Sequence, residues 1–410
     1  MISLRREQLY QIPFIIISFA LIYSYSTIYM CIDFARGTII STILIVIGVL
    51  LCLLGVQKYK VKKEQIYFLI IMFVVNIMYL ALRRNGSLNA ILILGVLFPI
   101  FVVFNYYLEQ KQIIKKFCKV FVIMLTVLAS ISLCYWLFGS ILGILKPEGS
   151  VIIDWGIISR INKYSVFYYT PQFADINFGG MHIGVRNCSI FAEAPMASSF
   201  FSVALLLNEF YVKYKNKVIN AILVVTIITT LSVTGWITLI ILFVYKIINL
   251  KIKSKIGYFI KYSSIIIAMI CSVGLIMSLF STKLASGSGI DRMSHILEEI
   301  LAFKKNILIG NGFNMYTNGS SNSFFALLAD GGLLLFSIYY IPILGILVYD
   351  FIIYKKFNYF IFTFFAMFLI TAVQYNILTI FIITLMWNIL LQRMFKKNKY
   401  NQKYNYLYIQ

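Results

Sequence analysis

The chain has 410 residues, of which 61% are hydrophobic and only 12% are charged, and its formal net charge is +22. Soluble domains carry about 25% charged residues. This composition therefore excludes a soluble domain and indicates an integral membrane protein. In a soluble protein such a positive charge would suggest nucleic acid as a partner. In a membrane protein the excess of Lys and Arg on the cytoplasmic side explains it, and no nucleic acid is expected.

Apolar runs near the roughly 20 residues that cross a bilayer predict transmembrane helices, because backbone groups in lipid must be satisfied within their own segment. We expect an all-α integral membrane protein, a single polytopic domain over residues 1–410 with about 12 spans, in a range of 11 to 13. The runs cover residues 12–32, 37–56, 65–82, 88–108, 118–144, 189–211, 218–233, 235–249, 257–280, 324–349, 358–373 and 376–392.

Two of these boundaries leave alternatives open. The stretch Ser232–Trp236 reads either as an outer turn between two short helices or as a kink in one long tilted helix. The break at 374–376 is similarly weak. The start, with Arg5 and Arg6 before a long apolar run, lacks a small-residue cleavage site and is interpreted as a retained first span.

The basic residues are distributed unevenly between alternate connectors. With the N-terminus placed in the cytoplasm, the inner connectors and tails hold 25 basic and 5 acidic residues, against 11 basic and 9 acidic residues outside. This asymmetry predicts that both ends are cytoplasmic and that the number of spans is even. The expected location is the bacterial cytoplasmic membrane.

Two long polar interruptions, 145–188 and 281–323, therefore face outward and offer the only room for a polar site. The first contains Arg160 and many aromatic residues among Asn and Gly, a composition that indicates folded structure rather than a linker. The short outer connectors carry Arg36, Arg83 and Arg84, which would suit phosphate or lipid headgroups because guanidinium groups bind them in bidentate fashion.

The first loop ends in Arg186-Asn187-Cys188-Ser189-Ile190-Phe191-Ala192-Glu193-Ala194-Pro195. If 186–193 is helical, Arg186 and Glu193 lie two turns apart on one face. If Pro195 instead occupies the first turn of a helix, Glu193 lies at its positive end and stays ionised. Either arrangement marks a polar spot at the outer surface, and a structural Arg–Glu pair is the simpler alternative.

The second loop contains a short amphipathic helix over 291–301. Helical spacing puts Met293, Leu297, Ile300 and Leu301 on one stripe, and Arg292, His295 and Glu299 on the other side. We expect this helix to lie on the outer face, either with a merely solvated polar side or with His295 as a proton carrier, because its pKa lies near neutrality.

A stretch rich in amides and hydroxyls follows, with Asn311 between two glycines and Asn322 before the next span. Such groups hydrogen-bond sugar hydroxyls, and they also make ordinary turns. The chain has no P-loop, Rossmann glycine pattern, G-x-S-x-G or H-E-x-x-H motif, so nucleotide hydrolysis and metal catalysis are disfavoured and no cofactor or metal is expected. The six scattered Cys residues favour helix packing over disulfides.

The order of these features resembles the O-antigen polymerase and O-antigen ligase superfamily of bacterial membrane glycosyltransferases. The likeness rests on the span count, the R-x-x-x-I-F-x-E-x-P segment from Arg186 to Pro195, and the G-x-G-F turn at Gly310–Phe313. It also includes the Asn-led entry from Asn322 to the glycine pair at Gly332. Ligase-type members have a His before that Asn, where this chain has Ser321, which favours the polymerase branch.

The resemblance implies transfer of a glycan from undecaprenyl pyrophosphate to a sugar hydroxyl of another lipid-linked repeat unit, without nucleotide or metal. The product would be O-antigen, capsule or exopolysaccharide, made beside a flippase and a chain-length regulator. Cations stabilise a departing pyrophosphate, a role expected of Arg186 and Arg292. Glu193, then His295, would accept the proton; Arg160, Asn311 and Asn322 would bind substrate. A lipid-linked oligosaccharide flippase, a ligase of the same superfamily and an inactive assembly partner are the alternatives.

Overall fold

The computed structural model describes residues 11–24, 27–54, 63–82, 87–110, 112–154, 158–164, 167–169, 171–178, 181–212, 216–252, 254, 256–259, 261–264, 287–316 and 322–395. Within these ranges, six helices are long and apolar enough to cross a membrane. They lie at Ala35–Leu54, Gln65–Leu82, Leu88–Gln110, Ile114–Ile141, Ser323–Tyr354 and Ile377–Met394. Four shorter apolar helices accompany them, at Gln11–Tyr23, Lys217–Thr229, Val233–Ile248 and Tyr359–Ile370.

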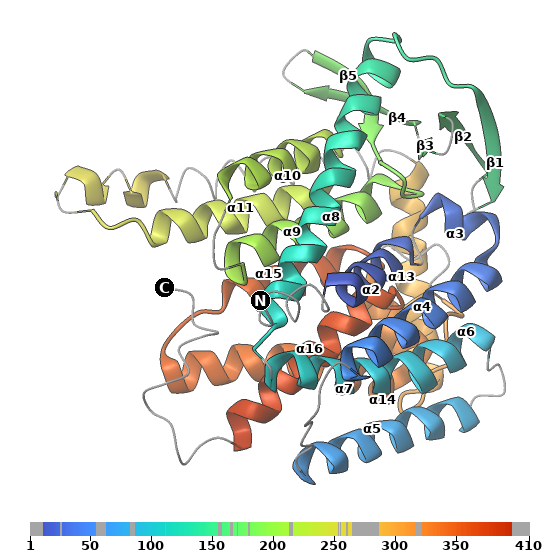
Figure 1. Ribbon diagram of the computed structural model, residues 1–410, viewed down its shortest axis with the longest axis vertical. Coiled ribbons are helices and arrows are strands. Elements are labelled where there is room, and N and C mark those ends of the chain that lie inside the picture. Colours follow the sequence, from blue (N-terminus) through green and yellow to red (C-terminus); the bar gives the residue numbers. More distant parts are fainter. Residues whose placement is uncertain are drawn as a thin grey trace, which may run out of the picture.

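The first half of the chain forms a helical layer that ends in a sheet (Figure 1). Its helices are α2 (Gln11–Tyr23), α3 (Ile28–Ile32), α4 (Phe34–Leu54), α5 (Lys63–Leu82), α6 (Leu88–Ala90), α7 (Phe98–Gln110) and α8 (Ile114–Cys134). Two π-helical segments, η1 (Ile91–Leu97) and η2 (Tyr135–Ile141), continue α6 into α7 and extend α8. The predicted run 12–32 is therefore divided, because α2 ends at Tyr23 and a separate short helix follows.

The second half of the chain contains the two most buried helices of the bundle, α9 and α16. The helices are α9 (Ala194–Phe210), α10 (Lys217–Thr229), α11 (Val233–Ile248), α13 (Gly287–Lys305), α14 (Ser323–Tyr354), α15 (Tyr359–Ile370) and α16 (Ile377–Phe395). Nearly every residue of α9 is buried, and 78% of the apolar window in α16 is buried, whereas only 22% of that in α5 is. The core of the bundle therefore lies around α9 and α16, and α5 lies at its edge.

The first long loop contains five antiparallel strands, so the all-α prediction is wrong for this segment. Strands β1 (Gly149–Asp154), β2 (Ile158–Tyr164) and β3 (Phe167–Tyr169) form one sheet in that order, and β4 (Pro171–Phe178) pairs with β5 (Met181–Asn187). Ile153 and Ile161 pack against Ile28 of α3. The indole of Trp136 donates to the carbonyl of Val185 over 3.0 Å. Both sheets therefore lie at one end of the bundle (Figure 1).

Two pairs of helices form antiparallel hairpins with their turns at the end that carries the strands. Asn220 of α10 and Lys246 of α11 both contact Glu209, at 3.2 and 3.6 Å, so the far ends of these helices lie together. The stretch around Ser232 is therefore an outer turn rather than a kink. Asp350 likewise joins Asn358, before α15, to Arg393, near the end of α16, which places residues 371–376 at the opposite end.

Helix α14 bends sharply at a glycine pair. Gly332 has a non-helical φ of 56°, and the ring of Phe324 lies only 5.3 Å from that of Tyr340. Sixteen residues would span about 24 Å in a straight helix, so the arm Ser323–Gly331 folds back against the arm that follows. The predicted run 324–349 is therefore two helical arms joined by a sharp bend, not one straight helix.

The second loop fills the bend in α14. The N–H groups of Leu333 and Leu334, left without intrahelical partners by the bend, donate to the carbonyls of Ile307 and Leu308 over 2.8 and 3.0 Å. A Cβ at Gly310 would lie 2.4 Å from the backbone of Asp330, and one at Gly332 would lie 2.5 Å from the nitrogen of Gly310. The two backbones can pass this closely only because both positions are glycine.

The described connectors lie at two opposite ends of the bundle. One end carries the strands, the bend in α14 and the turns 230–232 and 371–376, and the other carries Lys217, Lys246 and Arg393. We call the end that carries both long loops the outer end. Most of the predicted span 257–280, and Arg83 and Arg84, lie outside the described residues, so the total of twelve spans stays a prediction.

Candidate functional site

The side chain of Arg186, near the end of β5, binds the turn between α10 and α11. Only 9% of this residue is exposed. Its Nε donates to the carbonyl of Thr230 over 3.0 Å, and an Nη donates to that of Leu231 over 3.3 Å. The last carbonyls of a helix have no intrahelical donors, and Leu231 leaves the helix with a φ of 49°. The end of α10 thus supplies the acceptors that orient this guanidinium.

Asn187 extends the contact into neighbouring helices. Its Oδ1 accepts from the Ser132 hydroxyl at 2.5 Å and from the Ser189 N–H at 3.1 Å. Its Nδ2 donates to the Thr229 hydroxyl over 3.1 Å. The residue is fully buried, so its amide fixes the end of β5 between α8 and α10. This role of Asn187 was not predicted, although its position next to Arg186 in the sequence was a signal for it.

The two hairpin turns touch each other and the start of α14. The hydroxyl oxygens of Thr234 and Thr371 lie 2.5 Å apart. The Ser323 hydroxyl donates to the Thr371 carbonyl over 2.6 Å and accepts from the N–H of Val373 at 2.9 Å. Ser323 therefore joins the bent arm of α14 to the 371–376 turn.

A buried carboxylate lies on the other side of that turn. Asp330 is fully buried. Its Oδ1 accepts from the N–H of Tyr316 at 2.8 Å, and its Oδ2 accepts from the hydroxyl of Tyr375 at 3.0 Å. The hydroxyl of Tyr79 donates to the main-chain carbonyl of Asp330 over 3.0 Å. Asp330 thereby fastens α5, the second loop and the 371–376 turn to one point.

These groups form what we call the outer polar layer, which consists of Arg186, Asn187, Thr230, Thr234, Ser323, Asp330 and Thr371. The hairpin helices that end at it are short: α10, α11 and α15 have 13, 16 and 12 residues. Such helices are about 20, 24 and 18 Å long, whereas a hydrocarbon core is about 30 Å thick. Polar backbone turns at membrane depth are tolerated only where protein or water surrounds them, and they commonly mark substrate sites.

An apolar pocket lies beside this layer, between α9, α15 and α16. Residues from the 371–376 turn and from the outer half of α9 close it at the polar end, and aliphatic and aromatic side chains line the remainder. The lining residues are Ser199, Phe200, Val203, Phe364, Met367, Phe368, Val373, Asn376, Leu378, Thr379 and Ile382. The 371–376 turn thus belongs to both the pocket and the outer polar layer.

Glu193 occupies the position that the second of the two sequence alternatives predicts. It precedes α9 with extended backbone, φ −141° and ψ 154°, and a Pro follows in the first turn, whereas residues 181–187 form β5. The helical alternative for 186–193 is therefore wrong. Its carboxylate is half-buried. Burial raises the pKa of the Cys31 thiol to about 12, and the charge of Glu193 adds to that increase, so Glu193 lies near α3.

Three of the predicted substrate-binding residues serve the fold. The amide of Asn311 donates to the carbonyls of Ala302 and Ala329 over 2.9 and 2.8 Å, which fixes the glycine turn against α14. Asn322 caps α14, because its Oδ1 accepts the N–H of Phe325 at 2.8 Å. Arg160 is exposed on β2 and donates from Nε to the Ser150 hydroxyl over 2.9 Å. Their substrate contacts stay predictions.

The predicted amphipathic helix exists as α13, and its polar side is not merely solvated. The leucine stripe is exposed, with Leu297 at 55%, and Glu299 is buried at 1%. His295 is partly exposed, with its Nδ1 3.7 Å from Glu298. The side chain of Arg292 lies outside the described residues. The described residues therefore do not join Arg186 and Arg292, and their proximity stays a prediction.

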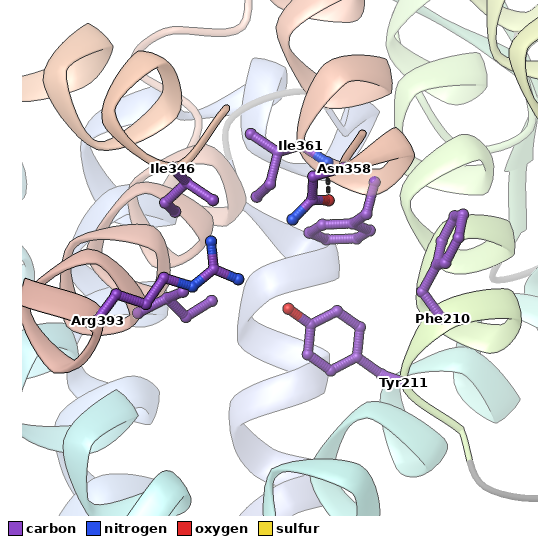
Figure 2. Close-up of a pocket in the computed structure, with 8 residues that line it drawn as sticks. Phe210, Tyr211, Ile346, Asn358, Ile361 and Arg393 are labelled. Atoms are coloured by element: carbon purple, nitrogen blue, oxygen red, sulfur yellow. Dashed lines mark hydrogen bonds between the residues drawn. The ribbon is translucent and has the colours of Figure 1, made fainter. Parts of the chain in front are cut away.

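The inner end carries a second polar cluster around a small pocket. Arg393 pairs with Asp350, and Asn358 donates to the same carboxylate over 2.8 Å. Figure 2 shows Arg393, Tyr211 and Asn358 reaching toward the pocket from three elements. Arg36, predicted on an outer connector, lies in the first turn of α4 and pairs with Asp33 at 3.1 Å, which gives this exposed guanidinium a partner.

The long apolar helices define the class: a mostly helical, multi-pass membrane protein. No protein-family model, no curated protein and no solved structure matches the chain.

Proposed function

We propose that this protein is a polysaccharide polymerase that transfers a glycan from undecaprenyl pyrophosphate to a lipid-linked acceptor sugar at the outer polar layer. The observation that carries the proposal is the placement of Arg186. A permanently charged guanidinium is held by the Thr230 and Leu231 carbonyls between turns that end short helices. A charge at membrane depth is costly and commonly functional.

The chemistry requires charge stabilisation more than covalent catalysis. The bond between C1 of the donor sugar and the pyrophosphate oxygen breaks, and its electron pair leaves with the pyrophosphate. The acceptor hydroxyl oxygen forms the new bond to C1. Arg186 is proposed to stabilise the charge that develops on the leaving group, because a fixed donor in a water-poor site needs no reorganisation. Arg292 is proposed to assist from the second loop.

Glu193 is proposed to take the proton of the acceptor hydroxyl. It lies before the first turn of α9, where the helix dipole favours the ionised carboxylate. It borders the same loop segment as Arg186, seven residues further along the chain. His295 is the alternative base, on α13. Neither role requires a metal or a nucleotide, because the glycosyl–pyrophosphate bond supplies the energy.

The apolar pocket supports a lipid-linked substrate. It lies between α9, α15 and α16 and shares Val373 and Asn376 with the turn that contacts Thr234 through Thr371. The pocket has a free volume of only about 20 Å³, so it would contact a short segment of a prenyl chain whose remainder lies in lipid, with the pyrophosphate at the polar end. The polymerase is preferred to a flippase because the polar residues of the sequence lie mainly in the two long loops and its spans are nearly uncharged.

The test is polymerisation by purified protein in proteoliposomes that contain undecaprenyl-pyrophosphate-linked repeat units and EDTA. We expect products of many repeats from the unaltered chain and only single-repeat glycan from Arg186→Ala. Arg36→Ala is the matched control, because Arg36 is an outer guanidinium that is exposed and paired with Asp33. Arg186→Lys tests the need for bidentate geometry and should retain a small fraction of the activity.

Long products from Arg186→Ala would contradict the role of this residue. Strict dependence on a metal ion would contradict the mechanism. Movement of the lipid-linked unit across the bilayer without any increase in its length would favour the flippase.

A further inference from the structure

The side chains of the described part of α13 divide into four sectors. A helix turns by about 100° per residue, which puts His295, Glu299 and Ala302 together on the side that packs into the protein, where Glu299 and Ala302 are 1% and 3% exposed. The half-buried side chains of Ile296, Ile300 and Phe303 come next. Met293, Leu297 and Leu301 follow, at 57%, 55% and 58% exposure, with the exposed Lys304 on the same sector. The last sector holds the polar residues Ser294, Glu298 and Lys305, all exposed.

This order differs from that of a helix on a soluble protein, which turns its apolar stripe inward. Here the inward sector contains a buried carboxylate, and the apolar sector faces out beside a separate polar sector. A helix at a membrane surface has this requirement, since one outward side meets hydrocarbon and the adjacent one meets water.

The exposed apolar sector continues onto the outer surface of α14. Ile307 and Leu308, just after α13, are 49% and 69% exposed, and their carbonyls accept the N–H groups of Leu333 and Leu334. From Leu333 the second arm of α14 exposes one stripe at helical spacing, formed by Leu333, Ile341, Leu344, Val348 and Phe351. This arm belongs to a helix long and apolar enough to cross a membrane, so its exposed stripe is the surface that faces lipid.

We propose that α13 is an interfacial helix that lies partly immersed in the outer leaflet, with Met293, Leu297 and Leu301 in contact with phospholipid acyl chains. The occupant of this surface is bulk lipid, because Ile307 and Leu308, which follow α13, are exposed where their carbonyls contact the start of the lipid-facing stripe of α14. Lys304 and Lys305, both exposed at the end of the helix, extend to the headgroups. This inference does not depend on the proposed enzymatic activity.

The test uses photocrosslinking in the full-length protein. A benzophenone amino acid is placed at Leu297 or Glu298, which are neighbours in sequence but belong to different sectors. The protein is reconstituted in vesicles of phosphatidylethanolamine and phosphatidylglycerol, irradiated and weighed by mass spectrometry. We expect phospholipid adducts at Leu297 at least fivefold more frequently than at Glu298. Val348, 54% exposed on α14, is the positive control.

Equal adduct yields at Leu297 and Glu298, with strong labelling at Val348, would overturn the proposal. A crosslinked dimer of the chain from Leu297 would also overturn it, because the stripe would then be an interface between two copies. Size-exclusion profiles that match the unaltered protein establish that each variant is folded before irradiation.

Discussion

Thr234 and Thr371 join two helix hairpins that are far apart in the sequence, with their hydroxyl oxygens 2.5 Å apart. Thr234 begins α11 and Thr371 follows α15, and both are at least 95% buried. Through Ser323 the same contact reaches α14. The hairpin that orients Arg186 and the turn that borders the apolar pocket are therefore coupled by this pair.

Thr371→Val should lower the thermal stability of the protein. The substitution removes one hydroxyl and leaves that of Thr234 buried, a loss of about 1–3 kcal/mol. The midpoint of thermal unfolding in detergent measures the effect. Thr126→Val is the control, because the Thr126 hydroxyl donates only to its own helix, at the carbonyl of Val122. Equal shifts for the two variants would contradict an interhelical role for Thr371.

Gly332→Ala should be much more destabilising than Gly143→Ala. Both glycines have a positive φ, 56° and 65°, and the ψ of −157° puts Gly332 in a region nearly restricted to glycine. A Cβ at Gly332 would also meet backbone atoms at 2.5–2.6 Å, whereas nothing lies within 4 Å of one at Gly143. The difference between the two unfolding free energies measures this backbone strain together with the close approach of α14 and the second loop. Similar losses would mean that the loop can move away.

Arg393→Gln and Asp350→Asn should each destabilise the inner end, by about 3–5 kcal/mol, because each leaves a buried charge without its partner. Both groups are nearly buried, at 10% and 3% side-chain exposure. The double variant should lose less than the sum of the two single losses, because its two neutral side chains leave no buried charge. Chemical denaturation of all four proteins measures the coupling energy, and strict additivity would show that the pair contributes nothing.

Cys31 should react slowly with iodoacetamide and faster in Glu193→Gln. Burial, then the charge of Glu193, raises the pKa of this thiol to about 12, so the reactive thiolate is rare near neutral pH. The raised pKa means that folding favours the neutral thiol, and this contribution to stability is complete below about pH 8.5. It is lost as the pH rises toward 12.

The measurement is the alkylation rate of Cys31 between pH 8 and 10, followed by mass spectrometry. Removal of the Glu193 charge should increase that rate, and Glu298→Gln, on α13, should leave it unchanged. An unaltered rate in Glu193→Gln would show that the charge of this carboxylate does not act on the Cys31 thiol.

The sequence predicts the helical elements well because apolar length and lysine position are local properties. The turn near Ser232 was recognisable as one of two alternatives, and the choice required contacts of Glu209 with Asn220 and Lys246. In the sequence, the bend at Gly332 is marked only by a pair of glycines. The bend is stabilised by the carbonyls of Ile307 and Leu308, which are distant in sequence and accept the N–H groups of Leu333 and Leu334.

The candidate site was predictable only in part. Arg186 was identified because a charge near a span is unusual, whereas Thr371 and Asp330 function through partners in other helices. In β1 and β2 apolar and polar residues do not alternate cleanly along the sequence, so a period of two is not evident there. The burial of Glu299 in α13 was not predictable, because helical spacing shows which residues share a side and does not show whether protein, lipid or water covers that side.

The short hairpins also bear on the permeability barrier of the cell. From the 371–376 turn, α15 provides only 12 residues, about 18 Å, of apolar length toward the opposite end of the bundle. Ions that reach this turn would meet a low-dielectric layer little more than half as thick as the bilayer. Phe364 and Phe368, both buried, line the apolar pocket at this point, so hydrocarbon in that pocket would complete the seal against leakage.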